Sequence, residues 1–166
     1  VMNITSPRIA LANIGTEKTK GDKLTLETYK LLEDSNIPIN FVGNLEARDL
    51  LRGKADIVVC DGFTGNMILK TIEGTALELM RGLKEEIMSS LRTKIGGALI
   101  KPALKNFKSK LDYSEHGGAP FLGVKAPLIK AHGSSDAKAV KNAIRQAKIC
   151  VESKVNELIE ESMTRR

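Results

Sequence analysis

The chain has 166 residues, of which 42% are hydrophobic and 28% are charged. This length suits one domain with a core of its own, and the composition excludes a disordered or low-complexity chain. Two cysteines are too few for a disulfide framework, which favours a reducing compartment. No apolar run reaches the roughly 20 residues of a membrane span. We therefore expect an intracellular protein that does not cross a membrane.

The excess of basic over acidic residues, 26 against 20, gives a net charge of +6. All of it falls in residues 87–111, which contain no acidic side chain and six basic ones: Arg92, Lys94, Lys101, Lys105, Lys108 and Lys110. The chain also has only four Phe, two Tyr and no Trp, which is poor material for stacking on bases. We therefore expect no nucleic-acid partner and a local role for the basic stretch.

Short apolar runs alternate with helical patterns along the chain. The runs predict strands at 8–12, 39–42, 55–60 and 128–131, and the apolar spacing predicts helices at 22–33, 69–91, 102–111 and 136–158. Gly96 and Gly97 are expected to form a corner between the second and third helices, and the glycines and proline of residues 117–123 predict a loop. The order indicates an α/β fold with a mainly parallel sheet flanked by helices and a protruding helix pair. Four strands are few for such a sheet, so we expect a piece of something larger.

Three turns follow predicted strands, where open α/β sheets bind ligands. Residues 13–21 hold Asn13, Gly15 and Lys20 in a composition able to wrap an anion, although a solvated loop fits equally well. Residues 61–66 follow the clearest strand, and their glycines would let backbone N–H groups approach phosphate or an oxyanion. The alternative is that Asp61 and Thr64 or Asn66 only cap the next helix. This turn comprises the candidate residues Asp61, Gly62, Thr64, Gly65 and Asn66.

The third turn, residues 131–136, places a histidine before a glycine and two hydroxyls at a predicted helix start. His132 could move a proton, and Gly133, Ser134 and Ser135 could hold an anion. A structural histidine and a simple serine cap explain the same residues. Because parallel strands end at one edge of a sheet, we expect all three turns to meet there.

Other common sites are not supported by the sequence. There is no Gly-x-Gly-x-x-Gly after a strand and no Gly-x-Ser-x-Gly elbow. Cys60 and Cys150 are far apart, with only His116 and His132 to join them, so we expect no metal site. Both cysteines are expected to be small buried side chains.

The basic stretch places apolar side chains among cations. Such a surface could lie on an anionic membrane, dock an acidic protein, contact a second subunit, or simply be solvated. The complete lack of acidic residues favours contact with a membrane or partner through Leu91, Arg92, Lys94, Ile95, Leu99, Ile100 and Lys101.

Several motifs, taken in order, resemble the bacterial phosphate acyltransferases of phospholipid synthesis, the PlsX family. The resemblance is carried by Asn13–Gly15 with Lys20–Gly21, by Asn40–Glu46, by Ala55–Asn66, by Leu69–Gly74, by Gly117–Gly123, by Ile129–Asp136 and by Asn142–Ala147. Members of that family are about twice as long, and the match covers only their C-terminal half. The resemblance therefore implies that residues 1–166 are half of one α/β acyltransferase domain.

The resemblance also implies a fold like that of isopropylmalate dehydrogenase and phosphotransacetylase, with no cofactor. The expected reaction moves a long-chain acyl group from acyl carrier protein to inorganic phosphate, giving acyl phosphate for a membrane glycerol-3-phosphate acyltransferase. A cytoplasmic homodimer, peripherally associated with the membrane, is expected. His132 and Asn66 are the candidate catalytic residues. Two alternatives stay open: phosphotransacetylase-like transfer from short acyl-CoA, and a non-catalytic module that binds phosphate ligands or membranes.

Overall fold

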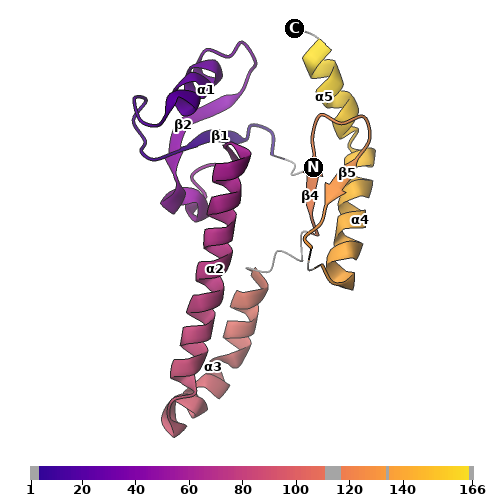
Figure 1. Cartoon of the computed structure of the whole chain (residues 1–166). Coiled ribbons are helices and arrows are strands. Elements are labelled where there is room, and N and C mark those ends of the chain that lie inside the picture. The colour runs from indigo at the N-terminus through magenta and orange to yellow at the C-terminus, as the bar shows by residue number, and fades with distance from the viewer. Residues whose placement is uncertain (1–3, 111–116, 134, 165–166) are drawn as a thin grey trace. The chain divides into compact units, whose positions relative to one another are not determined.

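The computed structural model describes residues 4–110, 117–133 and 135–164. The chain forms two compact units, Asn3–Ile87 and Met88–Arg166 with Val1–Met2, and each is described by itself. The first unit contains the strands β1, β2 and β3 with the helices α1 and α2, and the second contains α3, β4, β5, α4 and α5 (Figure 1).

A three-stranded parallel sheet is the centre of the first unit. Its order is β2-β1-β3, from Asn40–Glu46, Arg8–Asn13 and Ile57–Val59. The middle strand supplies the buried centre of this unit with Ala10, Leu11 and Ala12. This confirms the expected α/β class with a parallel sheet flanked by helices, because a parallel strand covered on both faces reads as a continuous apolar run.

Strand β2 continues past the glycine that was expected to end it. The register changes from Ile9 opposite Phe41 to Ala10 opposite Gly43, so Val42 is an extra residue in a bulge. Gly43 has a φ of +92°, a conformation that favours glycine. The strand resumes beyond the bulge and ends at Glu46, not at Val42 as predicted.

A side-chain cap starts the helix that follows the first strand and its loop. Helix α1, Lys23–Glu33, begins after Asp22, whose carboxylate accepts a hydrogen bond from the Thr25 N–H. Its Tyr29 packs edge-on against Phe41 of β2, with ring centroids 5.2 Å apart. A 3-10 helix, Ala47–Arg52, follows β2, and α2 runs from Gly62 to Ile87.

An ion pair fixes the start of the sheet. The guanidinium of Arg8 donates to both carboxylate oxygens of Asp56 at 2.9–3.0 Å, and its backbone N–H donates to Oδ2 at 2.8 Å. The side-chain and backbone hydrogen bonds from Arg8 lower the pKa of Asp56 from 3.8 to about 2. This carboxylate ties β1 to the segment entering β3.

The pH dependence of unfolding tests this pair. Because the pKa of Asp56 is lowered by folding, its contribution is present above about pH 4 and is lost as the pH falls toward about 2. Urea unfolding of an Asp56→Asn variant should show lower stability at pH 7 and a weaker pH dependence between pH 4 and 2. Glu157→Gln, at an exposed carboxylate of α5, should keep the wild-type profile. An Asp56→Asn profile parallel to the wild-type one would contradict the assignment.

The second unit begins with one long helix in place of the expected glycine corner. Helix α3 runs from Leu91 to Lys110 through Gly96, Gly97 and Pro102. The break lies at residues 88–90, because Ser90 and Thr93 cap the new helix reciprocally: the Ser90 N–H donates to Thr93 Oγ1 at 3.1 Å, and the Thr93 N–H donates to Ser90 Oγ at 3.2 Å. The predicted corner at residues 95–100 is therefore wrong.

The rest of this unit is a small antiparallel sheet with two helices. Strand β4, Ala119–Phe121, pairs antiparallel with β5, Leu128–Lys130. Helix α4, Ala137–Glu152, packs against both strands, and α5, Val155–Thr164, packs against α4 (Figure 1). The prediction that residues 128–131 join the parallel sheet is wrong, since their partner is a strand that was expected to be a loop.

Two expectations about the last helix have different outcomes. Residues 134–136 include three side chains able to cap the predicted helix, and Asp136 caps α4, accepting from the Ala139 N–H at 2.8 Å. The single predicted helix is divided at residues 153–154, where Lys154 has a φ of +50°. In residues 4–110, 117–133 and 135–164, no helix combines the length and the apolar character that crossing a bilayer requires.

Candidate functional site

A pocket of about 700 Å³ lies in the first unit, where β1 and β3 end and α1 and α2 begin. It therefore occupies the place at which two of the three predicted turns meet. Most of its wall is apolar, and the polar side chains come from the two turns and from the first turns of α1. Its lining residues are Leu11, Ala12, Asn13, Ile14, Gly21, Asp22, Leu24, Thr25, Thr28, Ala47, Val59, Cys60, Asp61, Thr64 and Ile68.

The loop after β1 is held by Asn13. Its Nδ2 donates to the Lys20 carbonyl at 3.0 Å, and its Oδ1 accepts from the Ile14 N–H at 2.8 Å. Gly21 closes the loop with a φ of +103°, where an added Cβ would lie 2.1 Å from Thr25 Oγ1 and 2.7 Å from Asn13 Oδ1. The loop therefore has a defined conformation, rather than that of a loose connection.

Glycine also allows a close approach at the middle of this loop. An added Cβ on Gly15 would lie 2.7 Å from Glu17 Oε2 and 2.9 Å from Lys20 Cγ. The Lys20 side chain thus folds over Gly15, and Lys20 itself is exposed. Asn13 lines the pocket, whereas Gly15 and Lys20 are not among the lining residues.

The turn after β3 is the start of α2, not an open glycine loop. Asp61 Oδ1 accepts from the N–H groups of Phe63 and Thr64, both at 2.9 Å, and the Gly65 N–H donates to the Asp61 carbonyl at 3.0 Å. Asp61 therefore caps α2, which is the alternative that the sequence left open. These N–H groups are already bonded within the helix start, so they are not available to an anion in this conformation.

The two glycines of this turn differ in what surrounds them. An added Cβ on Gly65 would lie 2.9 Å from Cys60 Sγ, so Gly65 lets α2 pack closely against the end of β3. Gly62 has no atom within 4 Å of such a Cβ. Cys60 is exposed and lines the pocket, so the expectation of a buried Cys60 is wrong, and that of a buried Cys150 is confirmed.

The charge of the pocket wall is negative. Hydrogen bonds from the Thr25 backbone and hydroxyl lower the pKa of Asp22, and bonds from the Thr64 hydroxyl and N–H lower the pKa of Asp61. Both carboxylates are therefore ionised at neutral pH. None of the lining residues is Lys, Arg or His. A phosphate at this edge of the sheet requires a cation from outside the wall, and the exposed Lys20 is the candidate cation in the same loop.

Asn66 and the residues of the histidine turn are not among the residues that line this pocket. Asn66 is exposed on α2 and is not among the lining residues. His132 and Gly133 are exposed and follow β5 in the second unit, where the His132 carbonyl accepts from the Ser135 N–H at 3.0 Å and Ser135 Oγ at 2.6 Å. Ser134 lies outside the described residues. The structure thus brings the first two turns together within one unit, and the third belongs to another sheet.

Several lining residues were missed from the sequence. Asp22, Thr25 and Thr28 recur every third residue at a helix start that follows the first turn. That spacing places them on one helix face and could have predicted their common direction. Within the described parts of the chain, no three His, Cys, Asp or Glu side chains gather closely enough to hold a metal ion.

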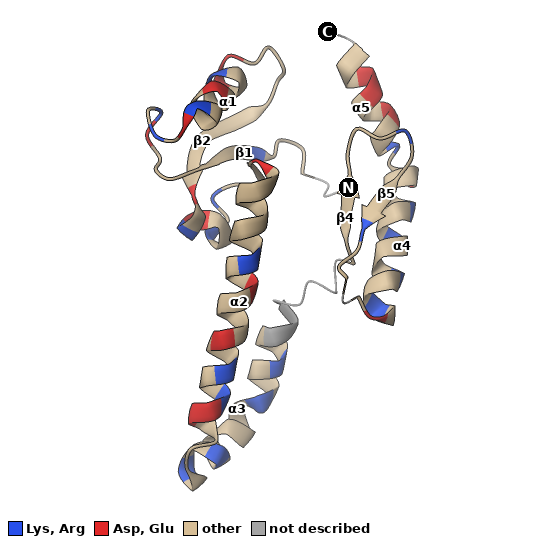
Figure 2. Ribbon diagram, viewed as in Figure 1, with Lys and Arg blue, Asp and Glu red and all other residues tan. Residues whose placement is uncertain are grey.

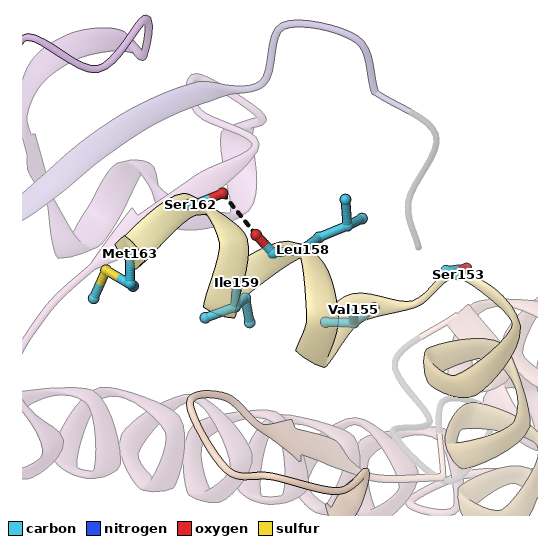
Figure 3. A pocket seen from close by; sticks show the side chains of 6 residues that line it. All are labelled: Ser153, Val155, Leu158, Ile159, Ser162 and Met163. Carbon is cyan, nitrogen blue, oxygen red and sulfur yellow. Dashed lines mark hydrogen bonds between the residues drawn. The ribbon is translucent and has the colours of Figure 1, made fainter. Parts of the chain in front are cut away.

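A second pocket, of about 330 Å³, lies along α5 in the other unit (Figure 3). It is lined by Ser153, Val155, Leu158, Ile159, Ser162 and Met163. The Ser162 hydroxyl donates to the Leu158 carbonyl at 2.7 Å, as Figure 3 shows, so this polar group is satisfied within the helix. No residue proposed for the site lines this pocket.

Comparison with known proteins places the chain in one family. The model of the family described as fatty acid synthesis protein matches residues 1–158. A phosphate acyltransferase of Clostridium botulinum (strain ATCC 19397 / Type A) is 58% identical over 163 residues, 98% of this chain and 48% of that relative. The phosphate acyltransferase of Clostridium kluyveri (strain NBRC 12016) is 56% identical over 155 residues, 93% of this chain and 46% of that relative. The chain thus spans about half the length of these relatives.

The match covers 163 of the 166 residues, so both strand-end turns of the first unit and the histidine turn of the second lie within the matched segment. This confirms the resemblance drawn from the motifs. The chain therefore belongs to the fatty acid synthesis protein family, among relatives that carry the name phosphate acyltransferase.

Proposed function

We propose that this chain is the C-terminal half of an enzyme that transfers a long-chain acyl group from acyl carrier protein to inorganic phosphate. The observation that carries the proposal is the 58% identity to a phosphate acyltransferase over 98% of the chain. The product, acyl phosphate, is an activated acyl donor, which a membrane glycerol-3-phosphate acyltransferase consumes in phospholipid synthesis.

The proposed step is a direct acyl transfer. An oxygen of hydrogen phosphate attacks the thioester carbonyl, a C–O bond forms, the C–S bond breaks, and the phosphate proton ends on the departing thiolate. Phosphate is already an anionic nucleophile, so the enzyme mainly has to position it and stabilise the oxyanion of the carbonyl. No cofactor is needed for this balance.

The residue roles in this proposal are assigned from the chemistry of the side chains. Lys20 supplies the positive charge that the pocket wall lacks, in a loop held by Asn13 and closed over Gly15. Thr64 lines the pocket at the start of α2, beside Gly62 and Gly65, and Asp61 caps that helix. Asn66 donates to the oxyanion, and His132, with Gly133, Ser134 and Ser135 beside it, protonates the thiolate.

The choice of acyl donor tests the proposal against its nearest alternative. The full-length enzyme should form acyl phosphate from phosphate and long-chain acyl carrier protein, measured as hydroxamate after trapping with hydroxylamine. Short acyl-CoA should be a much poorer donor. Activity with short acyl-CoA alone would favour a phosphotransacetylase-like enzyme, and binding of phosphate without any transfer would favour a non-catalytic module.

Helix α3 supports a further part of the proposal, contact with an anionic surface. Because the helix is continuous, Leu91, Ile95 and Leu99 lie at i, i+4 and i+8 on one face, and all three are exposed. Lys94 and Lys101 flank this face on one side and Arg92 on the other. Figure 2 shows Lys and Arg, and no Asp or Glu, along the described part of α3.

An apolar stripe between cations is typical of a helix that lies in a membrane interface. We therefore assign Leu91, Arg92, Lys94, Ile95, Leu99, Ile100 and Lys101 to peripheral contact with anionic lipid, in a cytoplasmic homodimer. The same face would also suit acyl carrier protein, which is acidic, or the second subunit. Liposome binding distinguishes the lipid from these alternatives.

A charge placed in the stripe should release the enzyme from membranes. Leu99→Glu should weaken binding to anionic liposomes by at least tenfold in a flotation assay, because about 1.5–3 kcal/mol of apolar burial is lost. Leu51→Glu is the matched control, because Leu51 is 77% exposed and Leu99 is 78% exposed. Equal binding of the Leu99→Glu variant and the wild type would exclude this lipid contact and leave the carrier protein or the second subunit as the partner.

A further inference from the structure

A buried amide on β2 reaches the loop that carries Lys20. Asn44 is 8% exposed, and its Nδ2 donates to the carbonyl of Glu17 at 2.9 Å. Asn44 pairs in register with Leu11 of the neighbouring strand. The sheet itself, and not only the adjacent loop residues, therefore holds the middle of the loop.

The same carbonyl accepts a second hydrogen bond. The Lys20 N–H donates to the Glu17 oxygen at 3.1 Å, so Asn44 and Lys20 share one acceptor with two lone pairs. On the other side of Lys20, its own carbonyl accepts from Asn13 Nδ2 at 3.0 Å. The carbonyl of Lys20 is thus fixed directly by Asn13. The N–H of Lys20 is bonded to the Glu17 carbonyl, which Asn44 holds.

Asn44 is a poor choice for stability alone. Its Oδ1 is buried and has no hydrogen-bond partner among the described residues. A buried amide oxygen without a partner is destabilising, and an apolar side chain of similar size would avoid that penalty. The amide is therefore useful at this position for its donor, which is the group that meets the loop.

We propose that Asn44 is a positioning residue for phosphate: by holding the Glu17 carbonyl, it sets the position of Lys20 toward the anion. This inference rests on the proposed function, in which Lys20 supplies the charge for phosphate. Asn44 acts through the backbone of the loop and does not itself touch the substrate.

Kinetics of the full-length enzyme test the inference with a nearly isosteric substitution. Asn44→Leu removes the donor and the unsatisfied oxygen together, so its melting temperature should equal or exceed that of the wild type. Its KM for phosphate should rise about threefold to tenfold, the value of one hydrogen bond, with kcat within about twofold. Asn40→Leu, an exposed position on the same strand, should leave both constants unchanged.

A double substitution separates positioning from a general structural effect. Lys20→Met should raise the KM for phosphate more than Asn44→Leu does. If Asn44 acts through Lys20, the double variant should have the same KM as Lys20→Met alone. A wild-type KM in Asn44→Leu, or effects that multiply in the double variant, would overturn the inference.

Amide hydrogen exchange gives a readout that does not depend on catalysis. In Asn44→Leu, the backbone N–H of Lys20 should exchange at least threefold faster than in the wild type or in Asn40→Leu. Unchanged exchange would overturn the inference even if the wild-type enzyme were inactive. A wild-type enzyme that forms no acyl phosphate would instead contradict the proposed function.

Discussion

Gly117→Ala is expected to remove about 4 kcal/mol or more of the stability of the second unit. Gly117 has a φ of +80°, and a Cβ at this position would lie 2.3 Å from the backbone nitrogen of Ala143 and from the backbone carbon of Asn142. Backbone atoms within a helix cannot move aside singly, so the clash would displace α4 from the segment before β4. Losses of about 4 kcal/mol or more are exceptional among point variants and come from a short list of causes, such as overpacking and backbone strain. Urea unfolding of the full-length protein measures it.

Gly123→Ala is a closely matched control for this prediction. Gly123 has a φ of +76°, and no atom lies within 4 Å of a Cβ added there. The two substitutions therefore share the cost of a left-handed backbone, about 1–2 kcal/mol, and differ in the clash. Equal losses of stability would show that the close approach of Gly117 to α4 does not exist.

The largest expected effects on activity come from Asn66→Ala and His132→Ala. If Asn66 donates to the oxyanion, its removal should lower kcat about 100-fold, the usual loss for one such donor. Removing His132 should cost about tenfold to 100-fold, near the low end for a general acid, because a thiol with a pKa of about 8.5 departs with little help. The measurement is acyl-phosphate formation by the full-length enzyme at saturating phosphate.

Asn40→Ala serves as the control for these two variants, since Asn40 is exposed at the amino end of β2, away from the carboxyl ends of the strands. Melting temperatures close to that of the wild type should accompany the losses of activity. Undiminished kcat in both Asn66→Ala and His132→Ala would contradict the assignment of these residues as catalytic.

The elements with the strongest local signals were predictable from the sequence. The apolar run of β1 and the helix from Asp22 to Glu33 have the predicted positions, because one is a continuous buried run and the other has a side-chain cap. The expectation that glycines end a strand or a helix was wrong at two places. Gly43 lies in a bulge within β2, and Gly96 and Gly97 lie within α3, where the serine cap at Ser90 determines the helix start instead.

Strand pairing was less predictable than strand position. Residues 128–130 are a strand as expected, but their partner is Ala119–Phe121, which contains Pro120 and was expected to be a loop. Lys154 divides the last helix by adopting a positive φ, which lysine rarely does. Neither feature has a recognisable local sequence signal, and the pairing of β5 depends on a partner strand elsewhere in the chain.

The candidate site was predictable as a place in the first unit, but only partly in its residues. The strand-end rule correctly brought Asn13, Asp61 and Thr64 to one pocket. It did not reveal that Asp61 uses the N–H groups of the helix start, or that Asn44 holds the loop from a neighbouring strand. These features depend on side-chain directions, which turn composition does not specify.

The most direct test of the central claim follows the oxygen atoms of phosphate. The full-length enzyme is incubated with long-chain acyl carrier protein and phosphate in which every oxygen is ¹⁸O, and the product is analysed by mass spectrometry. If a phosphate oxygen attacks the thioester and the C–S bond breaks, the acyl phosphate retains all of the labelled oxygens. Free fatty acid without label, or no product that depends on phosphate, would contradict the claim.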